Sequence, residues 1–199
     1  MSNEHKGGWA SPAPAGLTAL AIACFTFFAV LTGIVPPTTT PLLGCWLIGG
    51  FVVQFVVALI ELKEGHVLGG NVFLFFSAFF MLTGGLEFLV KGSEVFASFG
   101  VTSEIDGWAW LVLFITLLLW TPAYLKTSTT VLGLTVLILD VAVLFVTLKD
   151  LAIVSAATGG LIAGYALGLA GIFAIYHAAA IQLNAAWNKV VLPLGGANS

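Results

Sequence analysis

Hydrophobic residues fill most of this chain, and short polar or proline-rich segments divide them into stretches long enough to cross a bilayer. Between Gly7 and Ile60 there is no charged side chain. This stretch is too long for one membrane helix, because about 20 apolar residues cross the hydrocarbon core. The run Pro36-Pro37-Thr38-Thr39-Thr40-Pro41 interrupts it, and prolines at this spacing cannot continue a helix. The pattern therefore predicts two membrane helices joined by a turn.

Four further apolar stretches follow, and each is again long enough to span. The six predicted spans lie at about 15–34, 42–61, 69–89, 107–125, 129–148 and 155–187. A polar N-terminal tail (1–10) and a short C-terminal tail (196–199) flank this single transmembrane domain at 11–195. The expected fold class is thus an all-α integral membrane protein with six transmembrane helices.

Composition supports a membrane protein and excludes several other classes. Hydrophobic residues make up 60% of the chain and charged residues 8%, against roughly a quarter charged in soluble domains. A net charge of −3 argues against a nucleic-acid partner, which needs a basic surface. The first sixteen residues lack the basic start of a cleavable signal peptide. Cys24 and Cys45 lie in apolar runs without metal-site or disulfide spacing, so no metal or cofactor is expected.

Aromatic and basic residues orient the chain in the membrane. Five tryptophans fall near predicted span ends, where such rings prefer the interface: Trp46, Trp108, Trp110, Trp120 and Trp187. Four lysines lie on the side shared by both termini: Lys6, Lys63, Lys126 and Lys189. Lys91 and Lys149 lie on the other side. The positive-inside rule then predicts cytoplasmic termini, in the plasma or inner membrane of the cell.

Polar side chains inside the predicted spans are candidates for function, because each costs free energy in lipid unless it is satisfied. Gln54 and Glu61 are seven residues apart and hence lie on one face of the second helix. They either line a solute path or, for Glu61, belong to a solvated turn. Glu87 near the end of the third span is expected to snorkel to the interface.

Asp140 lies near the middle of the fifth span, where an unpaired carboxylate is expensive. It is therefore either protonated or partnered, and His177 is the other titratable side chain at comparable depth. A protonatable Asp140–His177 pair is one hypothesis. The alternative is a hydrogen-bonded acid at a helix contact.

Glycines in the last span predict close helix packing. Gly160, Gly164 and Gly168 follow one another at four-residue steps on one face, a pattern that lets another helix approach. The partner helix lies within the subunit or in a second subunit.

The segment Ser11-Pro12-Ala13-Pro14-Ala15-Gly16-Leu17 has the features of a helix start. Ser11 suits the N-cap and Pro12 the first turn. A helix N-terminus presents free N–H groups that attract anions, although a simple cap at the membrane surface explains the segment equally well when it is taken alone.

This segment resembles the Asn-Pro-x-Pro-x-Gly-Leu signature of the acetate/succinate transporter family, small six-helix acetate permeases. Further matches follow in order along residues 11–195: Gly50, Gln54, Glu61, Gly65, Gly69 and Phe73, then Ala174-Ile175-Tyr176, Leu183-Asn184 and Val191-Leu192-Pro193-Leu194-Gly195. The resemblance implies a homohexamer in which each protomer has its own pore for small monocarboxylates, chiefly acetate.

The resemblance also implies roles for particular residues. An hourglass waist is expected at Leu20, Phe76 and Leu134. Substrate contacts are expected from the opening motif and from polar groups of later helices: Ser11, Pro12, Pro14, Gly16, Gln54, Glu61 and Asn184. The chain departs from the family pattern where Ser11 replaces Asn and Leu20 replaces Phe, and Phe76 lacks the hydroxyl of Tyr.

Three alternatives to an acetate pathway stay open at this point. One is a pore for another small solute, such as formate, urea or ammonium. Another is a membrane subunit that transports nothing. An enzyme is disfavoured, because His5, His66 and His177 form no cluster in the sequence. A passive channel and proton-coupled transport are both compatible with the residues.

Overall fold

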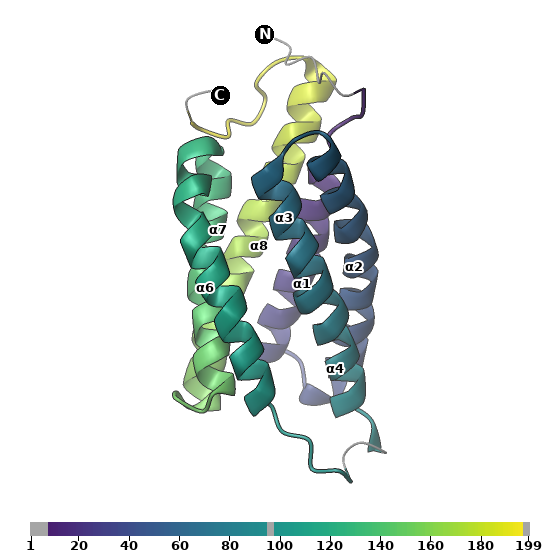
Figure 1. Ribbon diagram of the computed structural model, residues 1–199, viewed down its shortest axis with the longest axis vertical. Coiled ribbons are helices and arrows are strands. Elements are labelled where there is room, and N and C mark those ends of the chain that lie inside the picture. Colours follow the sequence, from purple (N-terminus) through teal and green to yellow (C-terminus); the bar gives the residue numbers. More distant parts are fainter. Residues whose placement is uncertain (1–7, 95–97, 197–199) are drawn as a thin grey trace.

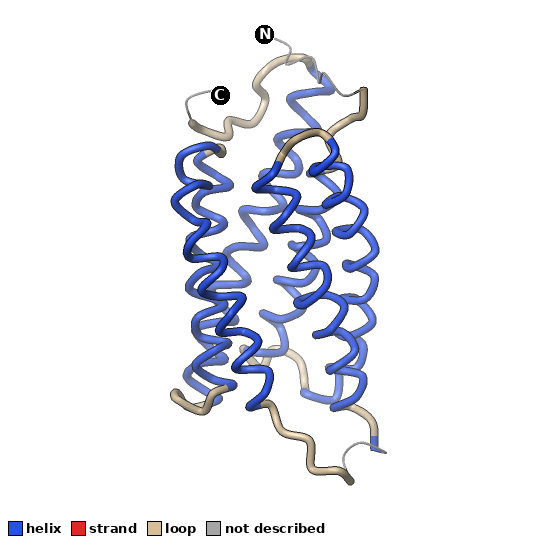
Figure 2. Tube along the Cα trace, in the orientation of Figure 1, coloured by secondary structure: helices blue, strands red, loops and turns tan. Residues whose placement is uncertain are grey.

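The computed structural model describes residues 8–94 and 98–196, and this part of the chain is a bundle of long helices that run side by side (Figures 1 and 2). Its α-helices are α1 (Ala13–Leu31), α2 (Thr40–Lys63), α3 (Val67–Phe75), α4 (Gly84–Lys91), α6 (Glu104–Thr127), α7 (Thr130–Asp150) and α8 (Ala156–Trp187). Taken with the short helices below, they give six helices long and apolar enough to span a membrane within the described residues. The predicted fold class and span number are confirmed.

The prolines after α1 separate it from α2 by a turn, as the sequence predicts. Pro36 is extended, Pro37–Thr39 forms a single 3-10 turn (η1), and α2 begins at Thr40. Pro41 falls in the first turn of α2, where its missing N–H breaks no helical hydrogen bond.

The third span is not one continuous α-helix. Between α3 and α4 the chain forms a π-helix, η2, over Phe76–Thr83. There the Thr83 hydroxyl donates to the carbonyl of Ala78, five residues earlier, at 3.1 Å. Hydropathy alone does not predict this change of helix type, because α3 and η2 are similarly apolar.

The spans form a ring that follows chain order. Each packs on the next, and α8 closes the ring on α1. The contact between the third span and α6 is the sparsest in the ring. The start of α1 and the end of α8 lie at the same end of the bundle, hereafter the terminal end, and the other end is the far end (Figure 1). Lys6, one of the lysines used for orientation, lies outside the described residues.

The glycine face of α8 packs on α1 of the same chain. A Cβ on Gly164 would lie 2.9 Å from Thr32 Cγ2, and one on Gly168 would lie 3.1 Å from the ring of Phe28. Only hydrogen fits at the first of these positions without a shift of the neighbour. The structure thus places the partner helix of this face within the subunit.

The segment after α8 folds back over the start of α7. The N–H groups of Thr130 and Val131 donate to the carbonyls of Gly195 and Leu194 at 3.2 and 3.1 Å. The side chain of Asn184 holds this segment: its Oδ1 accepts from the N–H groups of 191 and 192 at 2.7 and 3.0 Å, and its Nδ2 donates to the carbonyl of 192 at 2.9 Å. The closing run of the sequence therefore forms a backbone clamp.

Candidate pore

An internal cavity of about 20 Å³ lies inside the ring, and every side chain that lines it is apolar apart from the indole N–H of Trp110. The lining residues come from α1, η2, α6, α7 and α8: Leu20, Phe27, Phe76, Phe80, Trp110, Leu139, Ala142, Val143, Val146 and Leu167. A cavity of this size holds about one water molecule. The axis of the ring is thus nearly closed by hydrophobic side chains.

Two of the three predicted waist residues meet at this cavity. Leu20 and Phe76 both line it, although they come from helices far apart in sequence. The structure does not place Leu134 with them. Leu134 is 41% exposed and shares the outer face of α7 with Leu137 and Val141.

Leu134 therefore does not line this cavity, and the reason is the helical register of α7. The residues of α7 that face the cavity are Leu139, Ala142, Val143 and Val146. This three- and four-residue spacing marks one face of a helix, and it extends back to Val136 and Leu132 rather than to Leu134. Lipid accepts apolar side chains on the outer face, so hydrophobicity does not distinguish the two faces.

Gln54 and Gly16 come together near the terminal end. The Gln54 side chain is 1% exposed, and its amide nitrogen donates to the carbonyl of Gly16 at 3.4 Å. The amide oxygen of Gln54 has no hydrogen-bond partner among the described residues. Gly16 is enclosed, since a Cβ there would lie 2.7 Å from the ring of Phe73. A strong polar group is thus held between α1 and α2 with one acceptor unused.

Glu61 is buried rather than part of a solvated turn. It is 6% exposed, and its Oε2 lies 2.7 Å from Nδ1 of His66. The pair ties the end of α2 to the start of α3. Nearby, the hydroxyl of Tyr124 in α6 donates to the carbonyl of Leu68 in α3 at 3.4 Å. The sequence did not single out His66 or Tyr124 as residues that make these contacts.

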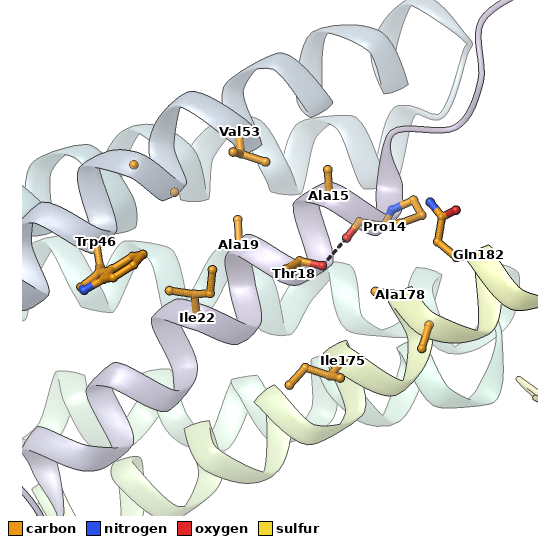
Figure 3. A pocket seen from close by; sticks show the side chains of 13 residues that line it. Pro14, Ala15, Thr18, Ala19, Ile22, Trp46, Val53, Ile175, Ala178 and Gln182 are labelled. Atoms are coloured by element: carbon orange, nitrogen blue, oxygen red, sulfur yellow. Dashed lines mark hydrogen bonds between the residues drawn. The ribbon is translucent and has the colours of Figure 1, made fainter.

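The opening motif lines a different space from the cavity. Figure 3 shows Pro14, Ala15 and Thr18 of α1 facing a groove that lies between α2 and α8. The groove has a volume of about 800 Å³ and opens on the surface of the bundle. Thr18 and Ile22 are on the opposite face of α1 from Leu20 and therefore point away from the internal cavity.

The predicted cap at Ser11 is shifted by one residue. Helix α1 begins at Ala13, its N-cap is Pro12, and Pro14 is the second helical residue. The Ser11 hydroxyl accepts from the N–H of Ala13 at a long 3.4 Å. Pro12 carries the capping carbonyl instead, which accepts from the N–H groups of Ala15 and Gly16.

Asp140 and His177 are not paired. Asp140 is 6% exposed and its Oδ2 lies 2.7 Å from the hydroxyl of Thr121 in α6, while its Oδ1 and Nδ1 of His177 have no hydrogen-bond partner among the described residues. The Thr121 hydroxyl also lies 2.9 Å from the carbonyl of Leu117. The Thr121 hydroxyl is thus the donor to Asp140 Oδ2 and is shared with the Leu117 carbonyl. The geometry is that of an acid at a helix contact.

Asn184 does not flank the waist either. All its described hydrogen bonds go to the backbone of 191 and 192, where they hold the clamp at the terminal end.

The far end carries a charged cluster whose members lie apart in the sequence, so the sequence does not show them as one unit. Lys91 Nζ lies 2.5 Å from Asp106 Oδ2 and 3.8 Å from Glu87 Oε2. Lys91 belongs to the third span and Asp106 to α6, so the contact bridges the sparsest part of the ring. The i, i+4 spacing of Glu87 and Lys91 was the available sequence signal. No group of three metal-ligating side chains lies together in the described part of the chain.

Comparisons with known proteins bear on the fold. No protein-family model and no curated protein matches the chain. Among solved structures, the chain is similar to the bacterial acetate channel SatP, with a TM-score of 0.81 at 22% sequence identity. The likeness covers 94% of this chain and 99% of that chain. The chain therefore has the six-helix fold of a bacterial acetate channel, as its sequence resemblance implies.

Proposed function

We propose that this protein forms a membrane pathway for acetate and similar small monocarboxylates. The observation that carries the proposal is the ring of spans whose axis narrows to an apolar level at Leu20 and Phe76. The full-length likeness in fold to an acetate channel supports it. An apolar level of this kind excludes hydrated ions and selects solutes by width.

The apolar level also bears on the form in which an acid crosses. Removing water from a carboxylate in a region of low dielectric is costly, and no charged side chain lines the cavity. We therefore propose that the acid passes the waist in its protonated form. Gln54, with its unused amide oxygen, is the acceptor that we assign to the hydroxyl of the acid near the terminal end.

Uptake of radiolabelled acetate into liposomes that contain the purified protein tests the function. Saturable uptake above that of protein-free liposomes is the expected result, and uptake equal to theirs contradicts the proposal. An imposed pH gradient separates the two modes of transport. Accumulation beyond the protein-free control under the gradient indicates proton coupling, whereas simple equilibration indicates a passive channel.

We assign Asp140 a structural role at the contact between α6 and α7, because its described partner is Thr121 and not His177. The variant Asp140→Asn is then expected to keep the pH dependence of acetate uptake. A shift of the pH profile in Asp140→Asn, with His177→Ala giving the same shift, would restore the proton-linked role.

Assembly and orientation complete the proposal. We propose a homohexamer with cytoplasmic termini in the cell membrane, from the family resemblance and the lysine distribution. Native mass spectrometry of the detergent-solubilised protein measures the subunit number. For orientation, Ser128→Cys at the terminal end and Ser155→Cys at the far end are labelled with a membrane-impermeant thiol reagent on intact cells, both in a Cys45→Ser background. Labelling of 155 but not of 128 is expected.

A further inference from the structure

Phe80 lies at the centre of an aromatic cluster on the axis of the ring. Its ring centroid is 5.2 Å from that of Phe27, 5.6 Å from that of Trp110 and 5.9 Å from that of Phe76. These four side chains come from α1, η2 and α6, and all of them line the internal cavity. Phe80 itself is 5% exposed. One side chain thus contacts the aromatic groups of three spans.

This cluster lies at a different depth from Leu20. Phe27 follows Leu20 by seven residues on α1, which corresponds to about 10 Å along the helix axis. Helix α1 runs from the terminal end toward the far end (Figure 1). Because Phe80 stacks on Phe27, the contact forms a second narrow level, on the far side of Leu20.

The helix that carries Phe80 differs from those that carry its partners. Phe80 belongs to the π-helix η2, whereas Phe27 and Trp110 belong to regular α-helices. π-helical turns interrupt regular helix packing and frequently occur at functional sites. The third span also makes the sparsest contact of the ring, with α6. Phe80 and Phe76 are therefore the two members of the cluster that lie on the π-helix.

We propose that Phe80 forms a second apolar constriction of the pathway and sets the upper size of the solute that crosses. This inference rests on the proposed function for the class of solute, and on the cavity and the ring contacts for its position. The present cavity holds about one water molecule. An acid larger than water passes only when the Phe80 ring leaves its stack on Phe27.

The test compares four variants in liposomes: Phe80→Ala, Phe80→Leu, Phe80→Trp and Phe79→Ala. Phe79 is the matched control, because it belongs to the same π-helix, is 58% exposed and does not line the internal cavity. The readouts are initial uptake of labelled acetate and butyrate, and osmotic water permeability measured by stopped-flow light scattering. The water readout does not depend on the identity of the solute.

Phe80→Ala is expected to raise the ratio of butyrate to acetate uptake about tenfold, since a few methylenes of pocket space are worth at least that much in discrimination. Phe80→Leu gives a smaller rise, Phe80→Trp lowers both uptake rates, and Phe79→Ala matches the unchanged protein. Water permeability follows the same order. If Phe80→Ala does not fold, Phe80→Leu and Phe80→Trp carry the test, because they change the volume less.

Failure of this inference is distinguishable from failure of the proposed function. The constriction is overturned, and the function left intact, if the unchanged protein takes up acetate while folded Phe80→Ala and Phe80→Leu have its butyrate-to-acetate ratio and its water permeability. Absence of acetate uptake, with water permeability that rises in Phe80→Ala and not in Phe79→Ala, supports the constriction and overturns the monocarboxylate function.

Discussion

Two helix contacts in the same ring are built in opposite ways. Between α1 and α8, glycines bring the backbones together, and Gly164 leaves no room for a Cβ beside Thr32. Between the third span and α6, the helices are held by long side chains that reach across. The described ties are Tyr124 to the Leu68 carbonyl, Phe75 with Trp120, Phe80 with Trp110, and Lys91 with Asp106.

The difference indicates where the bundle is able to open. At the glycine contact the side chains of α1 lie directly against the backbone of α8, which has no side chain there to rearrange, so the two helices move together or not at all. A contact made by side chains changes width when those side chains change rotamer. Trp110 of α6 lines the internal cavity and contacts Phe80 across this side-chain contact. We expect the pathway to widen toward α6 while α1 and α8 stay fixed.

The largest expected effect is at the glycine contact. Gly164→Leu forces α8 away from Thr32 and should lower the free energy of unfolding by about 3 kcal/mol, the upper end of the usual cost of overpacking in tight cores. Thermal unfolding in detergent measures it. Ala157→Leu is the matched control, because Ala157 is an exposed residue of the same helix, and equal melting of the two variants would contradict a rigid contact.

A smaller effect is expected on the wall of the cavity that α7 forms. Val143 is 5% exposed and lines the cavity, whereas Val141 is 44% exposed on the outer face of α7. Val143→Ala enlarges the cavity and should raise the uptake ratio of propionate to acetate about tenfold.

Val141→Ala and Leu134→Ala should leave that ratio unchanged. A shift in size selectivity caused by Leu134→Ala would return Leu134 to the waist and place the pathway on the other face of α7.

The third prediction concerns the charged tie at the far end. Lys91→Met leaves the carboxylate of Asp106 without its cation, and the Asp106 side chain is 9% exposed. We expect a loss of about 1–2 kcal/mol in stability, between the values for surface and buried ion pairs, with faster acetate uptake as the contact with α6 loosens. Lys149→Met is the control, because Lys149 pairs with Asp150 of its own helix. The same uptake rate in both variants would show that the tie does not restrain the pathway.

The smallest effect is expected at the terminal end of the same contact. Tyr124→Phe removes one long hydrogen bond to the Leu68 carbonyl and should cost about 0.5–1 kcal/mol. Tyr165→Phe, at a tyrosine that is 63% exposed, gives the baseline. If Tyr124→Phe and Tyr165→Phe unfold at the same temperature, the terminal end of the contact is held by packing alone.

The sequence predicts the spans well and their orientation about their own axes poorly. Span number follows from length and hydropathy, which the bilayer imposes on any helix that crosses it. Which face of a span points inward does not, because lipid and the bundle interior are both apolar. Leu134 illustrates this limit: motif spacing alone assigned it to the waist, and the helical register of α7 turns it outward.

The sequence identifies the unusual polar residues of the spans, but it predicts their contacts less well. Glu61 and Gln54 are buried at the contacts of α2, as expected because a polar side chain that faces lipid costs free energy. Asn184 is also engaged, but with the backbone of residues 191 and 192. A sequence motif does not distinguish a side chain that binds a solute from one that binds the chain itself. The π-helix that carries Phe80 had no sequence signal at all.

The closure of α8 on α1 has a consequence for biosynthesis. The first span enters the membrane early, yet its principal neighbour is the last span to be made. Until α8 is inserted, Phe28 and Leu31 face lipid or a transient partner in place of the α8 glycines. The ring is therefore completed only after the translocon has released the sixth span, and a ribosome stalled within α8 would leave five inserted helices without a closed interior.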